Sequence, residues 1–155
     1  MINRIKGDLL KLAEEGEFDI IVHGCNCFTT MGSGIARQIR EQYPDAFRAD
    51  YVTQRGDIMK LGTFTSAKVG DLLIVNAYTQ YTFQSGEEFN DLFEYASFEV
   101  ILKKLAHAYP DQRYGFPLIG QGLAGGDPTL INGLIEKFSN EIDGTVTVVE
   151  YDPTA

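Results

Sequence analysis

Two glycine-containing segments hold the residues of this sequence that are best suited to bind a ligand. The first runs from His23 to Ala36 (HGCNCFTTMGSGIA), and the second runs from Gly120 to Gly126 (GQGLAGG). Each follows an apolar, strand-like run and precedes a helix-like pattern. Glycine lets a backbone approach a ligand closely, and the free N–H groups at a helix start carry partial positive charge. Loops of this kind are suited to hold phosphate groups.

The charged residues around both segments narrow this chemistry. No Lys or Arg lies between Lys11 and Arg37, and none lies from Tyr114 to Glu136. Backbone amides would therefore hold the phosphates, which favours a diphosphate in a groove over a triphosphate with magnesium. The Lys-Ser/Thr pair of a P-loop and the third glycine of a dinucleotide fingerprint are absent. Either loop alone could be a tight turn with a helix cap, but two of them at two strand ends favour a ligand site.

Polar side chains beside the first loop are the candidates for catalysis. His23 ends an apolar run, where a neutral imidazole could position water or donate to a phosphate, and a purely structural role is an equal alternative. Asn26 carries an amide that needs partners if it is buried, and a ribose could supply them. Asn76, near the end of another apolar strand, could reach the same site. The Tyr- and Phe-rich stretch from Tyr78 to Phe83 could close over it.

The elements that must position these residues alternate between strands and helices, which predicts an α/β domain with its sheet between helix layers. Asp8 and Asp127 are expected to cap helices, the latter with proline directly after it. We expect about six strands and four helices, in which a short helix over 45–54 continues from the helix over 35–43. The expected strands are 2–6, 19–23, 63–67, 72–78, 114–118 and 145–151, and the expected helices are 9–15, 35–43 with 45–54, 89–108 and a helix that begins at Pro128.

Composition excludes several classes of function. The 155 residues suit one compact domain, and 22 acidic against 13 basic residues give a net charge of −9 that disfavours nucleic acid as a partner. No apolar run approaches the roughly 20 residues that span a bilayer, and the start has no signal-peptide pattern, so we expect a cytoplasmic protein without a membrane partner. Cys25 and Cys27 are expected to be buried, reduced thiols, and neither a metal nor a cofactor is expected.

Three segments resemble the macrodomains, a family that binds ADP-ribose. They are Lys6–Leu10 (KGDLL), Ile20–Ile39 (IIVHGCNCFTTMGSGIARQI) and Phe116–Asp127 (FPLIGQGLAGGD), in the family's order along essentially the whole chain. The second segment is the most specific and looks most similar to the ADP-ribose 1″-phosphate phosphatase branch. The resemblance implies one macrodomain over residues 1–155, with a three-layer α/β/α fold and a central mixed sheet of about six strands.

The resemblance also implies roles for single residues. Asp8 matches the residue that receives the adenine amino group, Asn26 matches an asparagine near the distal ribose, and His23 matches a histidine at the distal end in phosphatase members. His23 and Asn26 are thus the expected catalytic residues, and Tyr151 is the expected aromatic partner of adenine. The expected ligand contacts are Gly7, Asp8, Leu9, Asn26, Gly32, Ser33, Gly34, Ile35, Ala36, Asn76, Ile119, Gly120, Gln121, Gly122, Leu123, Ala124 and Tyr151.

The sequence departs from the family pattern in ways that narrow the expected activity. Ala124 stands where many macrodomains have an aromatic ring against the distal ribose. The branch that cleaves ADP-ribose from glutamate uses a lysine and an aspartate, but here Val75-Asn76-Ala77 and Gly122-Leu123-Ala124 occupy those positions. We therefore expect a metal-independent hydrolase that binds ADP-ribose 1″-phosphate and yields ADP-ribose and phosphate. The alternatives are a non-catalytic ADP-ribose-binding module, or a hydrolase that removes ADP-ribose from protein or nucleic acid.

Overall fold

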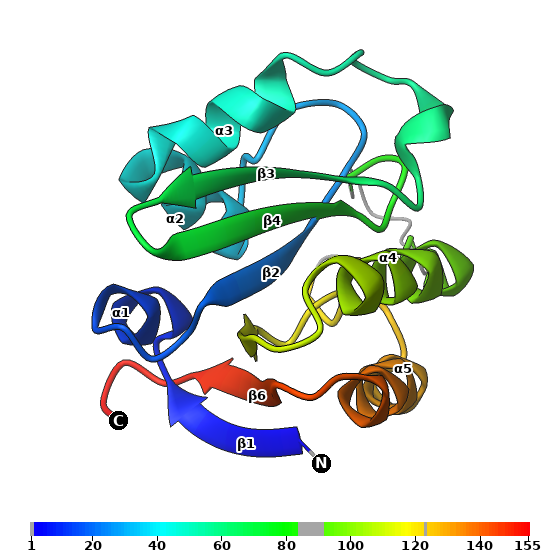
Figure 1. The fold of residues 1–155 in the computed structure, drawn as a ribbon. Coiled ribbons are helices and arrows are strands. Elements are labelled where there is room, and N and C mark those ends of the chain that lie inside the picture. The colour runs from blue at the N-terminus through cyan, green and yellow to red at the C-terminus, as the bar shows by residue number, and fades with distance from the viewer. Residues whose placement is uncertain (1, 84–91, 123) are drawn as a thin grey trace.

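The computed structural model describes residues 2–83, 92–122 and 124–155 and contains a six-stranded mixed sheet (Figure 1). The strand order is β1-β6-β5-β2-β4-β3, and every neighbouring pair is parallel except β3 and β4. Apolar runs that are buried on both faces form the central strands, as expected for a parallel sheet. The strands are β1 (Ile2–Gly7), β2 (Ile20–Cys25), β3 (Phe64–Val69), β4 (Leu72–Tyr78), β5 (Arg113–Phe116) and β6 (Thr145–Tyr151).

Helices cover both faces of this sheet, which confirms the predicted three-layer α/β fold (Figure 1). On one face α4 and α5 pack against a core centred on β2, β5 and β6, and on the other face α1, α2 and α3 complete a second core. The helices are α1 (Leu9–Glu14), α2 (Gly34–Gln42), α3 (Pro44–Tyr51), α4 (Tyr95–Ala108) and α5 (Pro128–Glu141), with a 3-10 turn η1 (Ile58–Lys60).

Both predicted helix caps are present. Asp8 Oδ1 accepts hydrogen bonds from the backbone N–H groups of Leu10 at 3.1 Å and Lys11 at 3.3 Å. Asp127 Oδ1 accepts one from the N–H of Thr129 at 2.8 Å. These bonds satisfy donors that a helix start leaves without partners, so they fix where α1 and α5 begin.

Two helix predictions need correction. The short helix after α2 does not continue from it, because a residue before proline avoids the helical region and Tyr43 adopts φ −127° and ψ 77°. The long helix begins at Tyr95 rather than at residue 89. Leu92 N–H donates to Ala124 at 2.8 Å and Glu94 N–H to Thr79 at 2.7 Å, so these backbone groups join loops instead of a helix. Residues 89–91 of that prediction lie outside the described residues.

The topology brings three loops to one edge of the sheet. Strands β2, β4 and β5 run parallel, with β2 between the other two, so their carboxyl ends lie side by side. Ligands of open α/β sheets bind at such an edge. Both predicted glycine loops start here. Among the described helices, none has the length and apolar character needed to cross a membrane.

Candidate functional site

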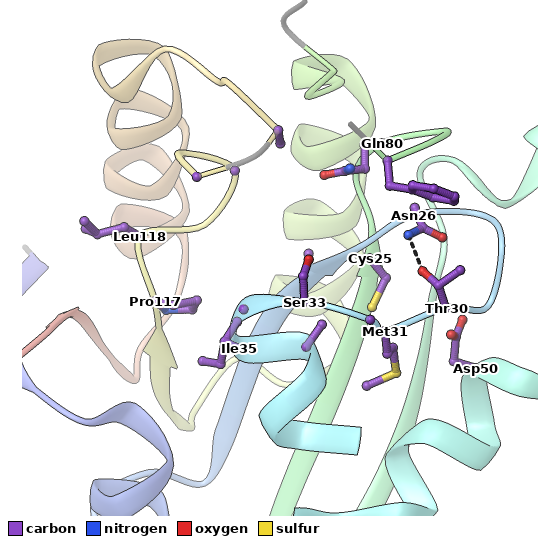
Figure 2. Close-up of a pocket in the computed structure, with 18 residues that line it drawn as sticks. Cys25, Asn26, Thr30, Met31, Ser33, Ile35, Asp50, Gln80, Pro117 and Leu118 are labelled. Atoms are coloured by element: carbon purple, nitrogen blue, oxygen red, sulfur yellow. Dashed lines mark hydrogen bonds between the residues drawn. The ribbon is translucent and has the colours of Figure 1, made fainter. Parts of the chain in front are cut away.

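A pocket of about 610 Å³ lies at this edge, between the two glycine loops (Figure 2). One wall comes from the loop between β2 and α2, and the other comes from the loop between β5 and α5. The stretch after β4 adds Gln80 and Phe83, and α3 adds Asp50. The lining consists of Gly24, Cys25, Asn26, Thr30, Met31, Gly32, Ser33, Gly34, Ile35, Ala36, Asp50, Gln80, Phe83, Pro117, Leu118, Gly120, Gly122 and Ala124.

The first loop is folded by the side chain of Asn26. Its Oδ1 accepts a hydrogen bond from the Phe28 N–H at 2.7 Å, and its Nδ2 donates to Thr30 Oγ1 at 2.7 Å. The helix that follows starts at Gly34, where φ is 57° and glycine is favoured. Ser33 occupies the N-cap position without a side-chain cap bond. The first N–H groups of α2 are therefore not capped by that side chain, and the first residues of the helix line the pocket, as an anion site requires.

The second loop closes the opposite wall through its glycines. Gly120 adopts φ 73°, and a Cβ there would overlap the ring of Phe93. The loop is held by hydrogen bonds from Gly126 N to Gly120 O at 2.7 Å and from Gly125 N to Gly122 O at 3.0 Å. A Cβ on Gly122 would meet no atom within 4 Å, because this residue faces the open pocket. Leu123 lies outside the described residues.

The electrostatics of the lining agree with the charge pattern of the sequence. Among the described residues that line the pocket there is no Lys or Arg, and Asp50 is the charged side chain. Attraction for an anion must come from the N–H groups of the loops and of the α2 start. Side chains at the two ends differ in character. Pro117, Leu118 and Ile35 are apolar, whereas Asn26, Thr30 and Gln80 are polar (Figure 2).

Comparison of the sequence with known proteins gives the family of this chain. No protein-family model matches the chain. An uncharacterized 17.5 kDa protein from the tk–vs intergenic region of Enterobacteria phage T4 is 32% identical over 162 residues, which cover 99% of this chain and 98% of the phage protein. This chain belongs to the family of that phage protein.

Solved structures identify the fold. The macrodomain of Mycobacterium tuberculosis DarG is similar with a TM-score of 0.72 and 25% identity, over 99% of this chain and 98% of that one. A protein of unknown function from Bacteroides thetaiotaomicron has a TM-score of 0.79 and 24% identity, over 97% and 98%. A Trypanosoma brucei macrodomain, solved in complex with ADP-ribose, has a TM-score of 0.66 and 17% identity, over 97% and 63%. The fold is the macrodomain fold.

The macrodomain structure places about half of the predicted contact residues around the pocket. Those in the lining are Asn26, Gly32, Ser33, Gly34, Ile35, Ala36, Gly120, Gly122 and Ala124. The remaining described ones lie outside the lining. They are Gly7, Asp8, Leu9, Asn76, Ile119, Gln121 and Tyr151, and the predicted catalytic residue His23 also lies outside the lining. Leu9 packs in the core beneath α1, and Tyr151 is exposed at the end of β6.

His23 does not stand at the mouth of the pocket. The predicted strand ended at His23, but β2 continues to Cys25, and His23 pairs with Asn76 inside the sheet. Both side chains are buried, and they contact each other through His23 Nε2 and Asn76 Oδ1 at 2.7 Å. Asn76 Nδ2 donates to Ala46 O, so its Oδ1 is the acceptor and His23 Nε2 carries the proton. These two residues thus satisfy each other below the pocket.

Burial also decides the charge of this histidine. Desolvation lowers the pKa of His23 to about 4, although the hydrogen bond with Asn76 works in the opposite direction. The imidazole is therefore neutral at physiological pH. Cys25 lies nearby, with its Sγ 3.7 Å from His23 Nε2, and burial raises the pKa of its thiol. Both cysteines are free and buried, as predicted.

Several lining residues were missed by sequence reasoning. Thr30 and Met31 lie within the first loop but were not among the expected contacts, and Pro117 and Leu118 were assigned to a strand that ends earlier, at Phe116. Asp50 was hidden in a helix. It lies one turn after Ala46 and shares the buried face of α3, but the burial of that face is known from the structure and not from the sequence near Asp50.

Proposed function

We propose that residues 1–155 act as one macrodomain that binds ADP-ribose in this pocket and holds the diphosphate between the two glycine loops. The observation that carries this proposal is the pair of loops across the pocket, whose lining has no Lys or Arg among its described residues. A diphosphate held by backbone amides fits such a groove. The T. brucei macrodomain was solved with ADP-ribose, which supports the same ligand for this fold.

The two ends of the pocket suggest how the nucleotide lies. The apolar end at Ile35, Pro117 and Leu118 suits the adenine ring, and the polar end at Asn26 suits the distal ribose. Asp8 remains the proposed partner of the adenine amino group, because its helix cap uses Oδ1 and Oδ2 could accept that bond.

We further propose that the macrodomain hydrolyses ADP-ribose 1″-phosphate without a metal. Water attacks phosphorus, the bond to the C1″ oxygen breaks, and phosphate and ADP-ribose are released. Such a reaction depends on positioning and on charge stabilisation, which N–H groups can provide. Asn26 would orient the terminal phosphate or the water. His23 would act indirectly and without touching the substrate, because its buried ring is held by Asn76 below the pocket.

Calorimetric titration with ADP-ribose tests the proposed binding, and a phosphate-release assay on ADP-ribose 1″-phosphate tests the proposed hydrolysis. We expect one-to-one binding of ADP-ribose and release of phosphate that a chelator does not inhibit. Lack of binding would reject the proposal as a whole. Binding without phosphate release would leave the alternative of a pure binding module. A gel assay on ADP-ribosylated protein and DNA tests the third activity, which the net charge of −9 disfavours for nucleic acid.

A further inference from the structure

One buried carboxyl group in the pocket lacks a hydrogen-bond partner on one of its oxygens. Asp50 lines the pocket from α3, and only 1% of its surface is exposed. Its Oδ1 accepts a hydrogen bond from the Tyr78 hydroxyl at 2.7 Å. Its Oδ2 is fully buried and has no partner among the described residues. A buried acceptor without a partner costs free energy, so its retention in a pocket points to a donor on the ligand.

The surroundings of Asp50 hold the carboxyl group in one orientation. The Tyr78 hydroxyl also lies 2.9 Å from Thr65 Oγ1, and the Asn76 amide donates to the same Thr65 oxygen at 3.1 Å. The Thr65 hydroxyl therefore donates a hydrogen bond to the Tyr78 oxygen, and the Tyr78 hydroxyl donates to Asp50. Figure 2 shows the carboxyl group of Asp50 directed toward the side of the pocket where Thr30 and Asn26 lie. Oδ2 is thus the oxygen without a partner, and a ligand hydroxyl reaches it once a side chain that covers it at the pocket wall changes its rotamer.

A buried cation near this network compensates for part of the cost of the negative charge. Burial raises the pKa of Asp50, while the Tyr78 hydrogen bond and the charge of Lys60 lower it. Lys60 is itself buried, and its Nζ donates to Thr53 Oγ1 at 2.8 Å and lies 5.2 Å from the centre of the Tyr78 ring. Tyr78 and Lys60 thus offset part of the desolvation that disfavours a negative charge on Asp50.

We infer that Asp50 is a specificity-determining residue whose Oδ2 accepts a hydrogen bond from a hydroxyl group of the ligand's distal sugar. This inference rests on the proposed function. The polar end of the pocket must meet the part of the nucleotide beyond the diphosphate, and hydroxyl groups are the donors that a sugar offers there. A carboxylate accepts hydrogen bonds and repels phosphate oxygens, so Asp50 favours a sugar hydroxyl as the group bound at Oδ2.

The test compares two substitutions on α3 and three ligands. Asp50→Asn keeps the shape of the side chain, but with Tyr78 still bound to the remaining oxygen it presents an NH₂ group to the pocket. Asp45→Asn makes the same change at an exposed position of the same helix and is the matched control. The ligands are ADP-ribose, ADP, and ADP linked to a ribose that lacks its C2″ and C3″ hydroxyl groups. Calorimetry gives the affinities, and thermal unfolding checks the fold.

We expect Asp50→Asn to weaken ADP-ribose binding by about tenfold or more, with ADP affinity unchanged. The native protein should bind the dideoxy ligand about tenfold more weakly than ADP-ribose, and Asp50→Asn should bind these two ligands equally. An unchanged preference for ADP-ribose over ADP in Asp50→Asn would overturn the role of Asp50 but not the proposed function. If that variant does not fold, equal binding of both sugar ligands by the native protein would overturn it. Lack of ADP-ribose binding by the native protein would overturn the proposed function as well.

Discussion

Replacement of Gly122 by valine is expected to weaken ADP-ribose binding by about a hundredfold or more while the protein stays folded. A Cβ at Gly122 would meet no described atom within 4 Å, so we expect the change to disturb the packing little. The valine side chain would enter the space where the diphosphate is proposed to lie, and would hold the phosphates away from the loop N–H groups. Gly32→Val tests the opposite wall in the same way, because a Cβ there makes only ordinary contacts with Thr30.

The matched control for this experiment is Gly133→Val. Gly133 is exposed on α5, away from the pocket lining, and a Cβ there also meets nothing within 4 Å. We expect this variant to bind ADP-ribose like the native protein, as measured by calorimetry. Native-like affinity in both Gly122→Val and Gly32→Val, with unfolding temperatures near that of the control, would show that the diphosphate lies elsewhere.

A second large effect is expected in the pH dependence of stability. The folded state holds His23 neutral with a pKa of about 4, whereas an unfolded histidine titrates near pH 6.5. Between these two pKa values the imidazole of His23 binds a proton in the unfolded chain but not in the folded protein. The free energy of unfolding is therefore highest, as far as His23 affects it, above about pH 6.5, and it decreases as the pH falls toward 4. The loss amounts to about 3 kcal/mol.

Denaturant unfolding of native protein and of His23→Gln at several pH values measures this effect. Glutamine does not titrate, yet it can donate a hydrogen bond to Asn76. The free energy of unfolding should therefore fall by about 3 kcal/mol more in the native protein than in the variant between pH 6.5 and 4. His107→Gln, at an exposed position of α4, serves as the control and should keep the native profile. Parallel profiles for native protein and His23→Gln would contradict a neutral, buried histidine.

The elements of the fold could be predicted because their signals are local. Apolar runs marked the strands, and Asp8 and Asp127 marked helix starts whose cap bonds the structure contains. The glycine loops were predictable for the same reason, since each follows a strand directly. The boundary of β2 was two residues too early in the prediction, and this small error moved His23 from inside the sheet to the pocket mouth.

The rest of the site depends on which elements meet in space. Nothing near Asp50 in the sequence indicates that α3 lies against the end of β4, where Tyr78 provides its hydrogen bond. The same holds for Asn76, whose partners come from β2, β3 and α3. A polar residue at the end of an apolar run can face a ligand or another buried side chain. Only the pairing of the strands decides between these roles.

The absence of lysine and arginine from the described part of the pocket lining also has a consequence for the effect of ionic strength. Proteins that hold phosphates with cationic side chains bind more weakly as salt screens the attraction. In the proposed binding mode short-range amide dipoles face the ligand, while the whole chain carries a net charge of −9 that repels an anionic nucleotide at long range. Added salt screens mainly that repulsion. Association of the nucleotide should therefore become faster, rather than slower, as the salt concentration rises.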